Sequence, residues 1–121
     1  MILWLTANSG AGKTTLAQKL KGPNTVILDG DEIRSVYNDW DLSTEGRRQQ
    51  NLRVAKLAKL LESQGLTVIV AVIAPFQSIR DEVQAITDCQ FIYIPFEGDD
   101  EIEDKPYERP TNCITLKERV L

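Results

Sequence analysis

The sequence predicts a three-layer α/β fold built on a parallel sheet of four to five strands. Short apolar runs alternate with segments of helical periodicity along the 121 residues. A glycine-rich turn follows the first apolar run directly, and a later run, 66–74, contains no charged residue. Strands that alternate with helices form parallel sheets with right-handed crossovers, because each helix leads the chain back across the sheet. We expect a single domain over residues 1–121.

The first half of the chain begins with two strands separated by a helix. The apolar run 2–7 predicts a buried strand. Apolar spacing then predicts a helix over 13–21, which Gly22 and Pro23 end. The β-branched run 25–29 predicts the second strand.

Two further helices and an interior strand are expected next. Asp31 is a candidate N-cap for a short helix over 31–37. Segment 43–64 repeats apolar residues at helical spacing after a Ser or Thr cap, and it ends at Gly65. The uncharged run 66–74 predicts a central strand that is buried on both faces.

Proline and apolar patterning define the last expected elements. Pro75 ends the interior strand and starts a helix that reaches about Ile86. A fourth strand is expected over 89–96, and a further short strand over 113–116.

A glycine-rich loop joins the first strand to the first helix, with the sequence Ala7-Asn8-Ser9-Gly10-Ala11-Gly12-Lys13-Thr14. In this context it is a Walker A motif of the P-loop NTPase type, in which backbone amides and a helix N-terminus bind phosphate. Lys13 is expected to bind the β- and γ-phosphates of ATP, and the Thr14 hydroxyl to bind Mg²⁺. Ala7 replaces the usual first glycine. The expected nucleotide contacts are Asn8, Ser9, Gly10, Ala11, Gly12, Lys13, Thr14 and Thr15.

Two carboxylates follow the second expected strand. In open parallel sheets the carboxyl edge faces the ligand, so Asp29 and Asp31 are placed for chemistry. A carboxylate there can accept a hydroxyl proton or hold Mg²⁺ through water. Arg34, one helical turn after Asp31, can bind an acceptor phosphate. The alternative is that both aspartates serve only as a turn and a helix cap.

The charge balance favours a small anionic ligand over a polymer. The formal net charge is −4, which argues against a nucleic-acid-binding surface, yet basic residues cluster between Arg47 and Lys59. The chain has no histidine, which excludes Ser-His and Cys-His nucleophiles. Cys89 and Cys113 lack metal-ligand spacing and are expected to be free thiols in a reducing cytoplasm. No apolar run is long enough to span a membrane.

Several segments together resemble the adenylyl-sulfate kinase family of P-loop kinases. They follow one another in the family's order, as Ser9–Ala17, Leu28–Arg34, Ser43–Leu61, Val68–Phe76 and Asp104–Pro110. The element Asp29-Gly30-Asp31-Glu32-Ile33-Arg34 is more specific to the family than the phosphate loop. The resemblance implies a single P-loop kinase-like domain that uses ATP and Mg²⁺ to phosphorylate the 3′-hydroxyl of adenosine 5′-phosphosulfate. Such an enzyme is a transferase of sulfate assimilation with an alcohol group as acceptor.

The resemblance also implies roles for single residues. Asp31 and Lys13 match catalytic residues, and Arg34 matches an arginine that binds the acceptor. The family's acceptor-binding Arg and Asn, three residues apart, match Arg47 and Gln50 without a gap. A shift of one residue gives Arg48 and Asn51 instead; Arg47 is preferred, and the choice of amide stays open. The implied substrate-binding set is Asp29, Arg34, Arg47, Asn51, Ile73 and Phe76.

For some of these residues a plain structural role is the alternative. The arginine pair at 47 and 48 can be a solvated helix start, and Phe76 can be a core residue.

The sequence departs from the family's pattern at three places. Ala74 replaces a serine, and Phe76-Gln77 replaces a tyrosine-arginine pair, which removes one cation. In the family, the region after the fourth strand carries an Arg-Asp-x-x-x-Leu-Tyr lid with further basic residues. Here the acidic run 97–104 leads almost directly to Tyr107, so this lid is expected to be shortened. An acidic loop repels a polyanionic acceptor and should weaken its binding more than that of ATP.

These departures leave three functions open. The first is an adenylyl-sulfate kinase, and the second is a P-loop kinase that acts on another hydroxyl acceptor. The third is a nucleotide-binding module with little catalytic activity. The sequence does not decide the oligomeric state, for which a homodimer is one alternative.

Overall fold

A parallel five-stranded sheet forms the centre of the computed structural model, which describes residues 1–8, 11–95, 107–110 and 113–115. The strand order is β2-β3-β1-β4-β5, and every neighbouring pair is parallel. The strands are β1 (Ile2–Thr6), β2 (Thr25–Asp29), β3 (Thr67–Ala71), β4 (Gln90–Tyr93) and β5 (Ile114–Thr115). The predicted α/β class and strand count are therefore confirmed.

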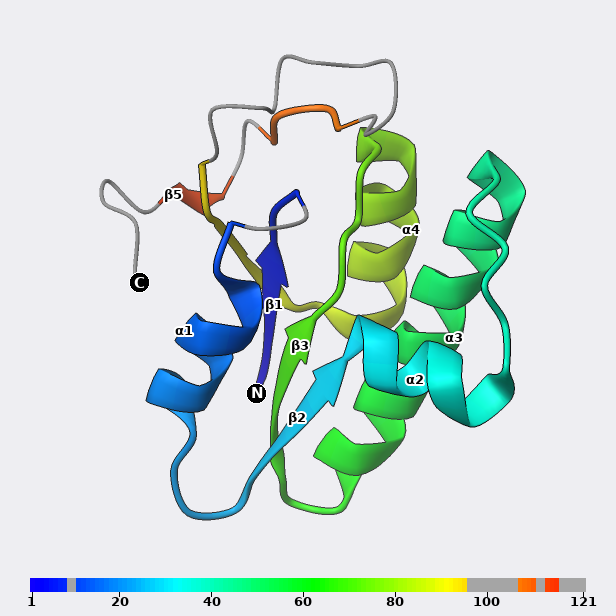
Figure 1. Cartoon of the computed structure of the whole chain (residues 1–121). Helices are drawn as coiled ribbons and strands as arrows, with labels where there is room; N and C mark the ends of the chain where they lie inside the picture. Colours follow the sequence, from blue (N-terminus) through cyan, green and yellow to red (C-terminus); the bar gives the residue numbers. More distant parts are fainter. Residues whose placement is uncertain (9–10, 96–106, 111–112, 116–121) are drawn as a thin grey trace.

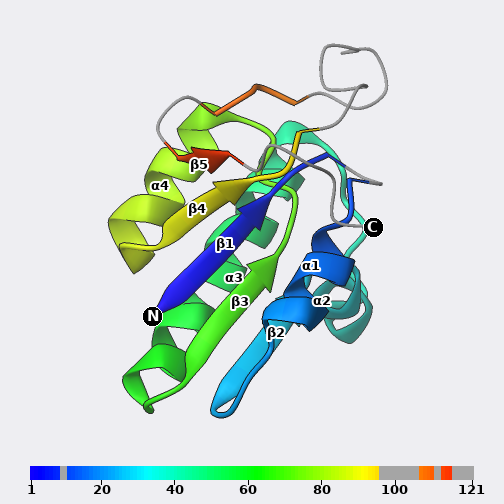
Figure 2. The ribbon, with the colours of Figure 1, turned by 90° about the vertical axis from the view of Figure 1, so that its left-hand side faces the viewer.

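Helices cover both faces of this sheet. Figures 1 and 2 show α1 (Lys13–Leu20) on one face and α3 (Thr44–Ser63) with α4 (Gln77–Thr87) on the other. A short helix, α2 (Gly30–Tyr37), continues directly from the end of β2. Buried side chains form two clusters, one between the sheet and α1 and a larger one between the sheet, α3 and α4. The three-layer prediction is confirmed.

The register of the strands brings the carboxyl ends of β1, β2, β3 and β4 to the same edge of the sheet. Asp29 at the end of β2 lies opposite Ala71 at the end of β3, and Ala71 also lies opposite Leu5 of β1. Thr6, the last residue of β1, lies opposite Tyr93 of β4. The loops that follow these strands therefore gather at the carboxyl edge, where ligands bind in open parallel sheets.

Several element boundaries differ from the sequence prediction. The strand expected over 66–74 ends at Ala71, because its partners β2 and β1 offer no pairing beyond that register. The helix expected from Pro75 begins at Gln77, since Phe76 still has an extended backbone. The strand expected over 89–96 covers only Gln90–Tyr93. These shorter strands leave longer loops at the carboxyl edge.

Helix caps correct one prediction and confirm another. The N-cap of α2 is Asp29, not Asp31: the Asp29 carboxylate accepts hydrogen bonds from the backbone N–H groups of Asp31 and Glu32. The cap of α3 is Ser43, whose hydroxyl accepts from the backbone N–H of Gly46. In the part of the chain that the structure describes, no helix is both long and apolar enough to cross a membrane. Both cysteines are free.

Candidate active site

The phosphate loop leads from the end of β1 into α1. Ala7 and Asn8 are buried, and the backbone N–H of Ala11 donates to the Asn8 carbonyl at 3.3 Å. Gly12 has a φ of 99°, a left-handed conformation that favours glycine over any side chain. The Lys13 ammonium donates to the carbonyls of Ala7 and Asn8, each at 3.2 Å, so the loop's own backbone holds this cation against it. Ser9 and Gly10 lie outside the described residues.

A single hydrogen bond joins this loop to the acidic edge of β2. The Thr14 hydroxyl donates to Oδ2 of Asp29 at 2.9 Å. The other oxygen of the same carboxylate caps α2, with Oδ1 3.0 Å from the backbone N of Asp31. Asp29 therefore connects the starts of α1 and α2, and the exposed Asp31 lies in the first turn of α2. Residues 15 and 31 are exposed at this edge, so the structure brings the predicted phosphate and acidic groups together.

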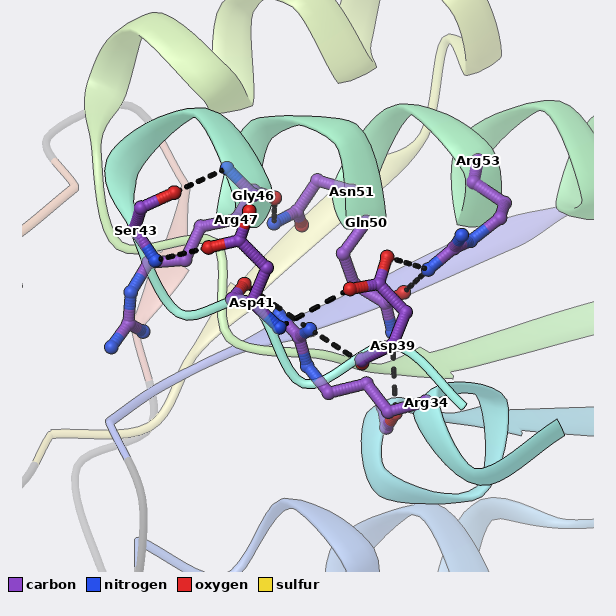
Figure 3. A network of polar contacts seen from close by, with 10 residues as sticks. Arg34, Asp39, Asp41, Ser43, Gly46, Arg47, Gln50, Asn51 and Arg53 are labelled. Atoms are coloured by element: carbon purple, nitrogen blue, oxygen red, sulfur yellow. Dashed lines mark hydrogen bonds and ion pairs between the residues drawn. The ribbon is translucent and has the colours of Figure 1, made fainter. Parts of the chain in front are cut away.

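Two arginines lie behind this edge and close to each other. Arg34 is only 8% exposed, and its Nη1 donates to the backbone carbonyls of Asp39 at 3.0 Å and Asp41 at 3.4 Å. The Nε of Arg47 donates to the Leu42 carbonyl at 2.8 Å. Burial lowers the pKa of the Arg47 guanidinium, and the positive charge of Arg34 lowers that pKa further. Both guanidiniums therefore bind backbone carbonyls of the α2–α3 loop, which spans residues 38–43, and Figure 3 shows the two side chains beside that loop.

The neighbouring arginine makes different contacts. The Nε and Nη2 of Arg48 bind the two carboxylate oxygens of Glu82 on α4, each at 2.8 Å, and its Nη1 binds Glu45 at 3.1 Å. These carboxylates raise the pKa of the Arg48 guanidinium. Arg48 thus fastens α3 to α4, whereas Arg47 is turned toward the α2–α3 loop. The preference for Arg47 as the acceptor-binding arginine stays a prediction.

Both candidate amides are buried and reach the carboxyl edge. Gln50 Nε2 donates to the Gly30 carbonyl at 3.2 Å, directly before Asp31. Asn51 Nδ2 donates to the Ile73 carbonyl at 3.2 Å. Each side chain is 1% exposed. The two sequence alignments therefore lead to two different amides. Gln50 holds the start of α2, and Asn51 holds the segment after β3.

The segment after β3 forms one of those walls. Ile73 and Phe76 are partly buried, and Ala74 between them is fully buried. Behind them, Arg80 of α4 is 1% exposed and donates through Nη1 to the Ala74 carbonyl at 2.6 Å. Its Nη2 donates to the Glu108 carbonyl, also at 2.6 Å. Arg80 thereby ties this wall to the segment 107–110.

The sequence reasoning did not single out Arg53 or Arg80, which hold much of this edge together. A signal for Arg80 existed: it lies on the same face of α4 as the buried residues Val83 and Thr87. An arginine on a buried helix face needs several hydrogen-bond acceptors. Arg53 offered no comparable signal, because a cation on a half-buried helix is ordinary.

Two further predictions concern metals and the lid. Within the described residues, no cluster of three or more His, Cys, Asp or Glu side chains could hold a metal ion by itself. The acidic run 97–104, expected as a shortened lid, lies outside the described residues.

The sequence matches the family model described as adenylylsulphate kinase over residues 1–105. A cytidine diphosphoramidate kinase from Campylobacter jejuni is 43% identical over 86 residues, which is 66% of this chain and 51% of that protein. An adenylyl-sulfate kinase from Bacillus velezensis is 40% identical over 92 residues, 70% of this chain and 47% of its own. The chain therefore spans about half the length of these curated relatives.

A solved structure supports the same likeness. The Mycobacterium tuberculosis APS kinase CysC, in complex with AMPPNP and APS, superposes with a TM-score of 0.84 at 27% identity. The alignment covers 98% of this chain and 89% of that one. The fold and the sequence thus point to the same group of proteins.

Proposed function

Because this chain belongs to the adenylylsulphate kinase family, we propose that it is an ATP-dependent kinase that phosphorylates a hydroxyl group. The proposed acceptor is the 3′-hydroxyl of adenosine 5′-phosphosulfate. The observation that carries the proposal is the 2.9 Å contact between Thr14 Oγ1 and Asp29 Oδ2. That contact puts a phosphate-binding loop and a pair of carboxylates at one point, as phosphoryl transfer to a hydroxyl requires.

The phosphate loop is the proposed ATP site. Backbone amides of the loop and the N-terminus of α1 bind phosphate oxygens, and Lys13 neutralises charge on the β- and γ-phosphates. The Thr14 hydroxyl and the Asp29 carboxylate offer the hard oxygen ligands that Mg²⁺ prefers. When bound, Mg²⁺ offsets negative charge on the polyphosphate.

Asp31 is the proposed catalytic carboxylate. It is exposed in the first turn of α2, two residues after Asp29, the last residue of β2. There it accepts the proton of the acceptor hydroxyl while that oxygen forms a bond to the γ-phosphorus and ADP leaves.

The acceptor is proposed to bind between α2, α3 and the wall after β3. Arg34 and Arg47 supply positive charge for its anionic groups. The Asn51 amide, bonded to the Ile73 carbonyl, fixes that wall, and Phe76 lines it. Gln50 is the alternative to Asn51 as the acceptor-binding amide, and it is held by the Gly30 carbonyl.

A second acceptor, cytidine diphosphoramidate, is favoured by the Campylobacter jejuni relative. The two departures beside the acceptor wall support it, since Ala74 lacks a hydroxyl and Gln77 lacks a charge. Both acceptors are nucleotides that carry anionic groups at one end, so the arginine pair suits either of them.

The test is ADP release from MgATP with each acceptor supplied separately. Turnover with adenosine 5′-phosphosulfate supports the first acceptor, and turnover with cytidine diphosphoramidate alone replaces it with the second. Asp31→Asn should lower kcat by about 100-fold or more, as loss of a general base does, without changing ATP affinity. A protein that binds ATP but turns over neither compound supports a nucleotide-binding module instead.

A further inference from the structure

The α2–α3 loop is held by polar contacts and one close approach to α3. Inside the loop, Asp39 Oδ1 accepts from the backbone N–H of Asp41 at 3.2 Å, and Asp41 Oδ1 accepts from that of Ser43 at 3.0 Å. A Cβ atom on Gly46, in the first turn of α3, would clash with the backbone and side chain of Asp41. The loop therefore rests directly on the helix, and its position depends on what pulls it there.

One guanidinium on α3 contacts this loop from the side. The Nη2 of Arg53 donates to Asp39 Oδ2 at 3.2 Å, and the guanidinium lies 4.1 Å from the centre of the Tyr37 ring. Tyr37 is the last residue of α2 and Asp39 belongs to the loop, so Arg53 binds both ends of the α2-to-loop turn. Figure 3 shows Arg53 and Gln50 side by side on α3, facing the carboxylate of Asp39.

The same guanidinium orients a buried amide. Arg53 Nη2 donates to Gln50 Oε1 at 2.5 Å, which leaves the amide nitrogen of Gln50 pointing the other way. That nitrogen donates to the Gly30 carbonyl at 3.2 Å, directly before Asp31. The Gly30 carbonyl and the Arg53 guanidinium select the same orientation of this amide, and without a donor at the position of Arg53 the buried Oε1 loses this hydrogen bond. Because Gln50 is 1% exposed, water cannot easily replace either bond.

We propose that Arg53 is the positioning residue of the acceptor side. It sets the α2–α3 loop, whose carbonyls at residues 39 and 41 hold Arg34, and it sets Gly30 through Gln50. Arg53 does not touch a reacting atom; it fixes where Arg34 and Asp31 stand. This inference rests on the proposed transfer of a phosphoryl group to a nucleotide acceptor.

The loop carries its own reporter. Trp40 is 53% exposed, whereas the other tryptophan, Trp4, is fully buried in the sheet. Quenching of tryptophan fluorescence by acrylamide, a neutral molecule, therefore follows the accessibility of Trp40. Arg53→Met keeps most of the side-chain stem and removes the guanidinium. Lys56→Met is the matched control, an exposed lysine one helical turn further along α3.

Arg53→Met should increase quenching of Trp40 and raise the acceptor KM by about tenfold, as loss of a charge-assisted hydrogen bond does. ATP affinity should stay within about twofold, because Arg53 contacts Asp39, Gln50 and Tyr37, none of which lies in the phosphate loop. Arg53→Lys should partly reverse both changes. An ammonium can donate to the Asp39 carboxylate or to the Gln50 oxygen, but it lacks the planar group that binds both. Lys56→Met should change neither quantity.

Unchanged Trp40 quenching and an unchanged acceptor KM in Arg53→Met would overturn the proposal. Equal losses of ATP and acceptor binding would also overturn it, because they indicate general destabilisation. Asp39→Asn removes the charge and one acceptor oxygen from the loop side of the same contact and serves if Arg53→Met fails to fold. If no acceptor is turned over by the unmodified protein, the proposed function fails. The quenching result then still decides whether Arg53 positions the loop.

Discussion

The two sides of the candidate site are held together in different ways. On the phosphate side, Lys13 bonds to carbonyls only five and six residues before it, and the decisive turn depends on one glycine. On the acceptor side, Arg53 reaches back 14 residues to Asp39, and Gln50 reaches back 20 to Gly30. A local loop can be recognised from a short motif, whereas a network of distant side chains can be recognised only in the folded chain.

The largest expected effect separates the two sides. Lys13→Met removes the cation that stabilises charge on the transferring phosphoryl group, so kcat should fall by about 100- to 1,000-fold. ADP release measures the loss, and acrylamide quenching of Trp40 should stay as in the unmodified protein. Altered quenching would mean that the two sides are not independent.

The adjacent arginines of α3 sharpen the comparison within the acceptor side. Arg47→Met should raise the acceptor KM by about tenfold or more, because the acceptor's anionic group loses a charged partner. Arg48→Met breaks the ion pair with Glu82 and should lower the melting temperature only slightly, since that pair is partly exposed. Initial rates at varied acceptor concentration and thermal unfolding separate the two. The reverse pattern would favour the shifted register, with Arg48 and Asn51.

Gly46→Ala tests the close approach of the α2–α3 loop to α3. The added Cβ clashes with Asp41, so the loop must move, at a cost of about 1–3 kcal/mol. Thermal unfolding should show the loss, and the acceptor KM should rise while ATP affinity holds. Gly65→Ala is the matched control at the other end of α3: it strains a φ of 89° but meets no atom within 4 Å. An effect of Gly65→Ala on the acceptor KM would contradict this interpretation.

Acid should produce the smallest effect. The backbone N–H of Asp41 holds the pKa of the Asp39 carboxyl below its usual value, and Arg53 and Arg34 lower that pKa further. A depressed folded pKa stabilises the docked loop above the usual aspartate pKa of about 3.9, and this contribution is lost as the pH falls through the folded pKa. Quenching of Trp40 should therefore rise modestly below about pH 4. Asp39→Asn should flatten this change.

The sequence predicted what depends on local chemistry and periodicity. The Gly12 turn, the Ser43 cap and the parallel direction of the strands follow from glycine freedom, hydroxyl capping and apolar spacing. Asp31 was wrongly expected to cap α2, because two aspartates stand close together and only the folded strand end decides which one caps. Arg34 was expected to bind an acceptor phosphate, which stays a prediction, and the sequence did not predict that its Nη1 binds backbone carbonyls of the α2–α3 loop.

Other contacts across the fold, unlike those of Arg80, had no sequence signature. Arg47 and Arg48 are adjacent residues of the same type, so the sequence alone does not separate their roles. Only the packing of α4 against α3 gives Arg48 a carboxylate partner in Glu82. The contact of Thr14 with Asp29 likewise depends on β2 and β1 lying on either side of β3. Such contacts follow from topology, which a motif does not contain.

Thr6, at the end of β1, binds two segments that are far apart along the chain. Its carbonyl accepts from the backbone N–H of Ile94 at 3.1 Å, and its hydroxyl shares a 2.7 Å hydrogen bond with the hydroxyl of Tyr107. Thr6 therefore fastens the residue after β4 and the segment 107–110 to the end of β1. A substitution that displaces the end of β1 should reach both of these parts at once, through a single residue.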